Sequence, residues 1–160
     1  MSDRSISIRA AGDADLSAMA ALINSAFAIE TFLEGPRTSE EQLRERMQKG
    51  LFLLGYDPKG RLTASVYVEI RGGRGYFGML AVDPSRQGLG LGRAMVEAAE
   101  DYCRRAGCKV MDLDVLSLRT ELPPFYKKLG YAPIGTEEFR PARPLKPGLE
   151  AHCIVMSKTL

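Results

Sequence analysis

Three glycines stand at alternate positions in the stretch DPSRQGLGLGRAMVEAAE, which covers residues 83–100. Gly88, Gly90 and Gly92 come directly before a long run whose apolar residues recur at helical spacing. The first turn of a helix carries unpaired backbone N–H groups and the positive end of the helix dipole. Because glycine has no side chain, a ligand can approach those N–H groups closely. This arrangement is typical of a site that binds phosphate or another anion.

The two standard nucleotide-binding patterns do not fit this loop. A Walker A sequence beginning at Gly88 would place its second glycine and its lysine at Arg93 and Ala94. The dinucleotide pattern GxGxxG requires a third glycine, where this chain has Arg93 or Met95. Two interpretations stay open from these residues alone. The loop binds another phosphate-bearing ligand, or it is a tight connection that only packs against a sheet.

The elements that position this loop are predicted from apolar periodicity and turn residues. Short apolar or alternating runs predict seven strands, over 5–11, 51–56, 61–71, 76–82, 109–116, 131–139 and 151–158. Helical spacing predicts four helices, over 15–27, 38–49, 90–106 and 122–130. Asp15 is the predicted cap of the first helix, and Thr38 with Glu41 form a predicted capping box for the second. The order of elements predicts a mixed α/β sheet rather than a regular βαβ repeat.

Composition narrows the class of protein. The 160 residues are enough for a substantial core, so we expect a single domain over 1–160. The net charge of +2 is too small to predict a nucleic-acid partner. No apolar run approaches the roughly 18 residues of a membrane span, and the N-terminus lacks the apolar centre of a signal peptide. The three cysteines show no CxxC spacing, which favours free thiols over a metal site and predicts a cytoplasmic protein.

A further pattern fits the glycine loop. Residues 87–92, QGLGLG, match Q/R-x-x-G-x-G/A and follow an apolar strand that ends in Val-Asp-Pro, and residues 123–135 read PPFYKKLGYAPIG. These two segments resemble the pyrophosphate loop and the tyrosine segment of the GNAT superfamily of acyl-CoA-dependent N-acyltransferases. The resemblance spans nearly the whole chain. It implies a mixed, mostly antiparallel seven-stranded sheet, flanked by about four helices and splayed at an acyl-CoA cleft.

The resemblance also implies which residues hold acetyl-CoA, the acyl donor. Backbone groups of Leu80, Ala81 and Val82 would pair with the pantetheine amides, as an added strand does. The pyrophosphate would be held by the loop and the start of its helix, which comprise Gln87, Gly88, Leu89, Gly90, Leu91, Gly92 and Arg93. Many members carry an asparagine seven residues before the motif tyrosine, where this chain has Arg119. Arg119 then either serves the cofactor or faces solvent. No metal is implied.

Transfer of an acetyl group from a thioester to an amine requires a proton donor for the leaving thiolate. The resemblance assigns this general-acid role to Tyr126, whose hydroxyl would point at the sulfur. A tyrosine hydroxyl suits the task because its unperturbed pKa of about 10 keeps it protonated at neutral pH. The other interpretation is a core aromatic residue with a satisfied hydroxyl.

The same reaction requires that the amine be neutral. A lysine-like ammonium with a pKa of about 10.4 is neutral only about one part in a thousand near pH 7.4. Members often place a glutamate on the strand before the glycine loop, but residues 76–80, YFGML, offer no acid. Glu69, near the end of the preceding strand, is the candidate base, acting through water; its alternative is a solvated strand-edge carboxylate. Glu30 and His152 are further candidates for the base, although Glu30 is more typical of a surface residue and His152 of a structural residue. Asp112 and Asp114 are assigned no role.

The acceptor is expected to be a primary amine of a small molecule or peptide. Arg37 could hold a carboxylate, or it could be a surface charge before the second helix. The loop 139–149 could close over the acceptor, contact the second subunit of a homodimer, or be a solvated connector. Two other function classes stay open. One is a non-catalytic acyl-CoA-binding module, and the other is a nucleotide- or partner-binding protein whose loop holds a different anion.

Overall fold

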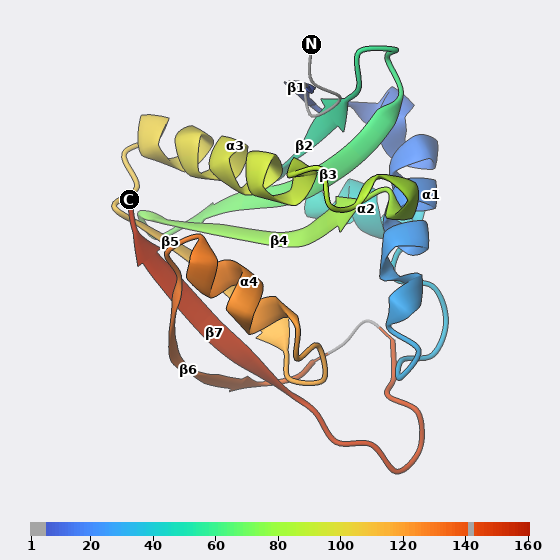
Figure 1. Ribbon diagram of the computed structural model, residues 1–160, viewed down its shortest axis with the longest axis vertical. Coiled ribbons are helices and arrows are strands. Elements are labelled where there is room, and N and C mark those ends of the chain that lie inside the picture. Colours follow the sequence, from blue (N-terminus) through green and yellow to red (C-terminus); the bar gives the residue numbers. More distant parts are fainter. Residues whose placement is uncertain (1–5, 141–142) are drawn as a thin grey trace.

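The computed structural model describes residues 6–140 and 143–160. Within them, seven strands form one sheet in the order β1-β2-β3-β4-β5-β7-β6 (Figure 1). The strands are β1 (Ser7–Ala10), β2 (Leu51–Tyr56), β3 (Leu62–Arg71), β4 (Arg74–Val82), β5 (Val110–Leu116), β6 (Ala132–Glu138) and β7 (His152–Thr159). Only β4 and β5 run parallel among these neighbouring pairs. The prediction of a mixed, mostly antiparallel seven-stranded sheet is confirmed. Residues 1–5 and 141–142 lie outside the described residues. They include the N-terminal region, the first residue of the strand predicted over 5–11 and part of the loop 139–149.

Four α-helices cover the two faces of this sheet within the described residues. They are α1 (Leu16–Ala26), α2 (Glu40–Arg46), α3 (Leu91–Arg105) and α4 (Leu122–Lys128). Helices α3 and α4 pack on one face, and α1 and α2 pack on the other (Figure 1). In this part of the chain, no helix combines the length and hydropathy of a membrane-spanning segment.

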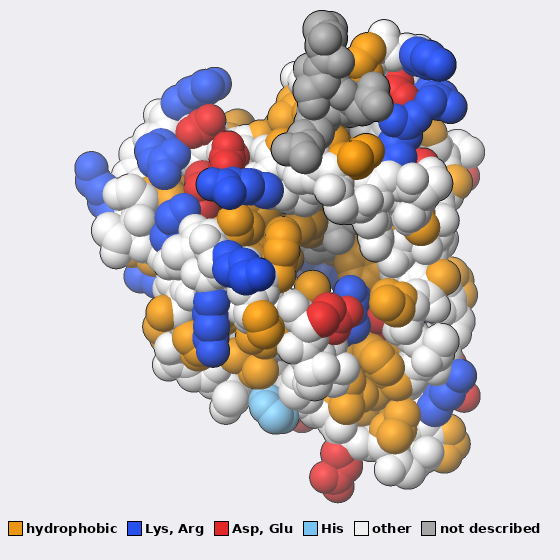
Figure 2. Space-filling model, in the orientation of Figure 1, with side chains coloured by type: hydrophobic (Ala, Val, Ile, Leu, Met, Phe, Trp, Pro, Cys, Tyr) orange, Lys and Arg blue, Asp and Glu red, His pale blue; other side chains and the backbone are white. Residues whose placement is uncertain are grey.

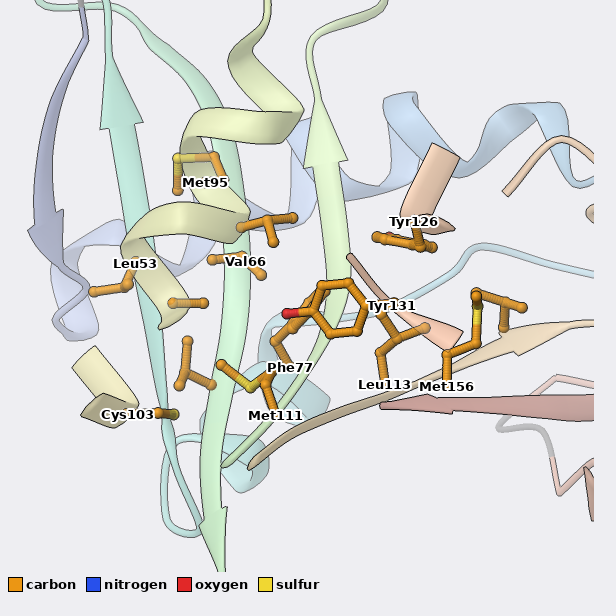
Figure 3. Close-up of a cluster of buried hydrophobic side chains, with 14 of the residues drawn as sticks. Leu53, Val66, Phe77, Met95, Cys103, Met111, Leu113, Tyr126, Tyr131 and Met156 are labelled. Atoms are coloured by element: carbon orange, nitrogen blue, oxygen red, sulfur yellow. The ribbon is translucent and has the colours of Figure 1, made fainter. Parts of the chain in front are cut away.

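Two hydrophobic cores result, one on each face of the sheet. The larger core joins Met95 and Cys103 of α3 to Phe77 of β4 and Tyr126 of α4 (Figure 3). The smaller core places α1 and Leu43 of α2 against the opposite face. Strands β2 and β3 are therefore buried on both faces, and such burial stabilises the sheet by roughly 25 cal/mol per Å² of apolar surface. Strand β4 lies beside them and contributes residues to both cores.

The two predicted helix caps differ from the caps observed. Ser39, not Thr38, caps α2, and its hydroxyl accepts a hydrogen bond from the Gln42 N–H at 3.2 Å. Thr38 is buried and its N–H donates to the Asn24 side chain at 2.9 Å, so the predicted capping box is wrong. Asp15 stands at the N-cap of α1, but its carboxylate does not cap the helix. It is bound instead by the guanidinium of Arg9, at 2.7 and 2.9 Å.

The sheet opens between β4 and β5. Their parallel pairing covers only Gly75 with Met111 and Tyr76 with Asp112. Strand β5 then pairs with β7 over its whole length, whereas β4 stays with β3. After Tyr76, the edge of β4 that faces β5 therefore has no strand partner among the described residues. The predicted splay of the sheet is confirmed at this position.

A bulge in β4 accompanies the opening. Ser65 pairs with Ala81 and Tyr67 pairs with Gly78, so that two residues of β4 oppose one residue of β3. Met79, inside the bulge, has φ of 50°, a left-handed conformation that is strained for a residue with a side chain. Bulges turn the strand locally and re-aim its backbone groups. This one lies beside the opening between β4 and β5.

Candidate active site

The glycine loop leads from β4 into α3. A short 3₁₀ turn over Pro84–Arg86 follows the strand, and Gly90 is the residue at the N-cap of α3. Gly88 and Gly90 have φ of 84° and 79°, which a residue with a Cβ adopts only under strain. No side chain of the described residues caps the helix, so the N–H groups of its first turn are open to a ligand. The glycines are required by backbone conformation, and they surround a helix N-terminus suited to an anion.

The residues assigned to the donor lie along one path. Leu80, Ala81 and Val82 form the last part of β4, beyond the point where β5 departs. The loop and the first turn of α3 follow directly. Gln87 and Arg93 are exposed at this end of the molecule, and Arg93 pairs with Glu97 at 3.0 Å on the surface of α3. A chain-like ligand could therefore run from the open edge of β4 to the helix N-terminus.

A cavity of about 420 Å³ lies where β4 and β5 diverge. Figure 2 shows the molecule hollowed between α4 and α1. Its walls come from the middle of β4, the end of β5, helix α4 and Arg46 at the end of α2. The connection after α1, the end of β6 and the residues Phe139, Arg140 and Arg143 add to them. Leu80 and Tyr126 both line it, so the cavity meets the donor path described above. The segments that build it are far apart in the sequence.

Tyr126 presents its hydroxyl to this cavity. The residue is 5% exposed, and its ring packs edge-on against Phe77 and Phe125, with centroids 5.8 and 5.0 Å away. The hydroxyl has no hydrogen-bond partner among the described residues, and its oxygen is not fully enclosed by protein atoms. It is therefore open to the cavity. Burial raises the pKa of Tyr126, with Asp114 adding to the rise and Arg119 opposing it.

The structure does not bring Glu69 together with Tyr126. Glu69 is absent from the walls of the cavity. Its carboxylate accepts the Tyr67 hydroxyl at 2.5 Å and forms an ion pair with Arg71. Although burial opposes the change, these two hydrogen bonds lower the pKa of Glu69. A carboxylate engaged in this way is a weak proton acceptor, and its position does not support the base role expected from the sequence.

A different carboxylate lies in the cavity wall. Asp114 of β5 accepts the hydroxyl of Tyr76 of β4 at 2.8 Å, and both residues line the cavity. Burial, with Asp114 as the next cause, raises the pKa of Tyr76. Sequence analysis assigned Asp114 no role, and its partner Tyr76 lies 38 positions away in the chain. Asp112, on the same strand, is occupied by Arg74 at 2.7 and 2.8 Å and by Ser157.

Glu30 joins three segments at the opposite wall. It is buried, and its carboxylate accepts from Arg119 at 2.7 Å and pairs with Arg143. The surface interpretation of Glu30 is therefore wrong, because the chain folds two guanidinium groups onto it. Arg119 does not face solvent either, since its side chain is 14% exposed and also pairs with Glu121. Sequence reasoning missed this cluster because its members are 89 and 113 positions apart.

The remaining segments and residues that the sequence singled out differ in whether they reach the cavity. His152 is exposed at the start of β7 and outside the cavity walls, where its backbone exchanges hydrogen bonds with Ser117. Arg37 lines the cavity and is half-buried. The described part of the loop 139–149 packs on the connection after α1, because Glu34 and Lys146 donate backbone hydrogen bonds to Pro144 and Phe32. Phe139, Arg140 and Arg143 of this loop line the cavity.

Family comparison agrees with the fold. Residues 17–131 match the model of the acetyltransferase (GNAT) family. The chain belongs to this family. The family prediction made from the glycine loop and the tyrosine segment is confirmed.

Two curated relatives are named as acetyltransferases. The chain is 28% identical over 144 residues to mycothiol acetyltransferase of Propionibacterium freudenreichii subsp. shermanii, covering 84% of this chain and 46% of the relative. It is 39% identical over 83 residues to glucosamine 6-phosphate N-acetyltransferase of Trypanosoma brucei brucei, covering 48% of this chain and 54% of the relative. The chain spans about half the length of these curated relatives.

Solved structures share the fold of this GNAT chain. The ribosomal-protein-S18-alanine N-acetyltransferase of Escherichia coli superposes with a TM-score of 0.80 at 21% identity, covering 97% of this chain and 94% of the other. A GNAT superfamily phosphinothricin acetyltransferase of Sinorhizobium meliloti, in complex with acetyl-CoA, gives 0.76 at 18% identity, covering 97% and 88%. These likenesses establish the architecture.

Proposed function

We propose that this GNAT chain is an N-acetyltransferase that moves an acetyl group from acetyl-CoA directly to a primary amine of a small molecule or peptide. The observation that carries the proposal is the open hydroxyl of Tyr126 in a cavity that meets the free edge of β4. Membership of the acetyltransferase family supports it, as do relatives named for acetyl transfer to other acceptors.

The donor would lie along the path from β4 to α3. Backbone groups of Leu80, Ala81 and Val82 would pair with the amides of the pantetheine arm along the strand edge that β5 leaves free. The N–H groups of the glycine loop and the first turn of α3 would hold the pyrophosphate. When bound, acetyl-CoA supplies the thioester whose carbonyl carbon the amine attacks. The chain contributes orientation, because a bound donor and acceptor react as one unit.

Tyr126 would act on the leaving group. As the C–S bond breaks, the sulfur takes up negative charge and requires a proton. The Tyr126 hydroxyl has no competing partner among the described residues, and its raised pKa keeps it protonated at neutral pH. Proton donation by a positioned side chain contributes about 10²–10⁴-fold to rate. Tyr126 is therefore the proposed general acid.

Asp114 is the carboxylate that we propose to accept the proton of the amine. It lines the cavity, it binds no arginine among the described residues, and its only side-chain hydrogen bond there comes from Tyr76. Its second oxygen is thus left for the ammonium of the acceptor. Glu30 cannot serve in this way, because two guanidinium groups occupy its carboxylate.

Thermal unfolding with acetyl-CoA, CoA, ATP and NAD, each added separately, tests donor binding. A ligand at about a hundred times its Kd stabilises the folded state by roughly 2.7 kcal/mol. For a chain of this size, the melting temperature should rise by roughly 5–11 °C. A rise with both CoA species and none with NAD supports the proposal, and no rise with either CoA species overturns it.

Thiol release in the presence of a panel of amines then separates an enzyme from a non-catalytic module. Acetylation predicts amine-dependent release of free CoA with formation of an acetylated product detected by mass spectrometry. CoA binding with no release for any amine in the panel would instead favour the acyl-CoA-binding module.

A further inference from the structure

Two arginines line the cavity without a partner for their charge. The side chains of Arg37 and Arg46 make no ion pair and no hydrogen bond with residues 6–140 or 143–160. Each guanidinium lies over an aromatic ring instead. Arg37 lies 5.2 Å from the centroid of Phe27, and Arg46 lies 5.1 Å from that of Tyr67. The rings hold the two groups in place and leave their N–H donors free.

The other arginines of the cavity have carboxylate partners. Arg119 and Arg143 share Glu30, and Arg140 pairs with Glu138 at 3.3 Å. Glu30 therefore already serves two guanidinium groups. No carboxylate of the described residues is close enough to pair with Arg37 or Arg46, which leaves a surplus of positive charge on this wall.

The surroundings of Arg37 agree with this surplus. Burial lowers the pKa of Arg37, and the positive charges of Arg46 and Arg143 lower it further, while Glu30 opposes them. Half-buried cations are costly unless they are paired. A planar guanidinium, with its fork of N–H groups, matches the oxygens of a carboxylate or a phosphate. An anion bound between Arg37 and Arg46 would therefore relieve an existing imbalance.

We propose that the acceptor is an amine that also carries an anionic group, a carboxylate or a phosphate, and that Arg37 and Arg46 bind this group. The inference rests on the proposed function, because it assigns the acceptor end of the same cavity. Asp114, on the β5 wall, provides the complementary negative charge for the ammonium. The cavity thus has separate positions for the two charges of a zwitterionic amine.

Matched pairs of amines test this inference. Each pair differs only in the anionic group: an α-amino acid with its carboxamide, and a phosphorylated amino alcohol or amino sugar with its unphosphorylated form. Calorimetry with the CoA-saturated protein measures binding, and thiol release with acetyl-CoA measures kcat/KM. We expect the anionic member of at least one pair to bind about tenfold or more tightly, since hydrogen bonds to charged groups are strong. The preferred pair distinguishes a carboxylate from a phosphate.

Variants assign the preference to the two arginines. Arg37→Gln and Arg46→Gln should each reduce the preference within the favoured pair by about tenfold and leave the neutral member unchanged. Arg44→Gln is the matched control, because Arg44 lies in the same last turn of α2 and is exposed. It should keep the full preference. Thermal unfolding with CoA shows whether each variant is folded and still binds the donor.

The outcomes separate this inference from the proposed function. Equal binding within every pair, or a preference that survives both variants, overturns the anionic acceptor, whether or not turnover is seen. If neither CoA species raises the melting temperature of the unmodified protein, the proposed function is overturned instead. If Arg37→Gln does not fold, Arg46→Gln decides the inference.

Discussion

The proposed donor path and the wall of the cavity proposed to bind the acceptor differ in the groups that form them. The donor path uses backbone: the free edge of β4 and the uncapped start of α3, within residues 80–93. The acceptor wall uses side chains, with Glu30, Arg37, Arg46, Arg119 and Arg143 drawn from four separate segments. Backbone groups can bind the constant part of a ligand, whereas side chains can be exchanged without changing the fold. The difference suits a fold that keeps one donor and varies its acceptor.

Tyr126 marks the meeting point of the two parts and should show the largest effect. Tyr126→Phe should lower kcat by about 10²–10⁴-fold, because the leaving thiolate loses its proton donor. The rise in melting temperature with CoA should persist, since the ring and its packing are retained. Steady-state kinetics and thermal unfolding measure the two effects.

Tyr131→Phe is the control for this substitution. The Tyr131 hydroxyl donates to buried Glu100 at 2.6 Å, and Tyr131 is not a wall residue of the cavity. Loss of this hydroxyl should therefore reduce stability and leave kcat within about threefold. Unchanged turnover in Tyr126→Phe would remove Tyr126 from the proposed mechanism.

Glu30 tests whether the acceptor wall depends on charge pairing. Glu30→Gln leaves the buried Arg143 guanidinium without a carboxylate and Arg119 with only the exposed Glu121, and it should lower the free energy of unfolding by about 3 kcal/mol. Urea unfolding measures the change. Glu138→Gln is the matched control, because its pair with Arg140 is exposed and should be worth less than about 1 kcal/mol. Equal stability losses in both variants would contradict the buried cluster as described.

Gly90 tests whether the donor path depends on backbone. A Cβ at Gly90 meets no atom within 4 Å, so Gly90→Ala is opposed only by its φ of 79°. The free energy of unfolding should fall by about 1–2 kcal/mol, and CoA binding should weaken. Gly107→Ala is the control: its φ of 90° is also left-handed, a Cβ there also meets no atom within 4 Å, and it follows the opposite end of α3. An equal loss of CoA binding in Gly107→Ala would contradict the backbone account.

The pH profile should show the smallest effect. Because burial raises the pKa of Tyr126 above its usual value of about 10, the hydroxyl stays protonated as the pH rises through the neutral and mildly alkaline range. At saturating amine, kcat should therefore not fall between about pH 7 and pH 9. An alkaline fall in that range that Tyr126→Phe does not share would contradict the raised pKa.

Local signals in the sequence led to the fold and to the proposed donor path. The seven-stranded sheet and the family are confirmed, and both rested on patterns that span few residues, such as QGLGLG and PPFYKKLGY. The helix caps show the limit of such patterns. Thr38 and Asp15 have the right residue types, but Asn24 and Arg9 bind them instead, and those partners come from other elements.

Glu69 has a partner that the sequence could have shown. Arg71 lies two positions along the same strand, so the two side chains share one face and pair. By contrast, the pair of Tyr76 with Asp114 and the cluster around Glu30 had no local signal. Their members meet only after β4 is placed beside β5 and the loop before β7 folds onto the connection after α1.

The sequence by itself determined where the backbone needs glycine and where a helix begins, because glycine conformations and helix termini follow from neighbouring residues. Only the tertiary structure decided which charges are neutralised and which are left over in the cavity. Charge pairing depends on distance in space. Neighbouring strands bring together residues 38 positions apart, and connections that pack on each other bring together residues 113 positions apart.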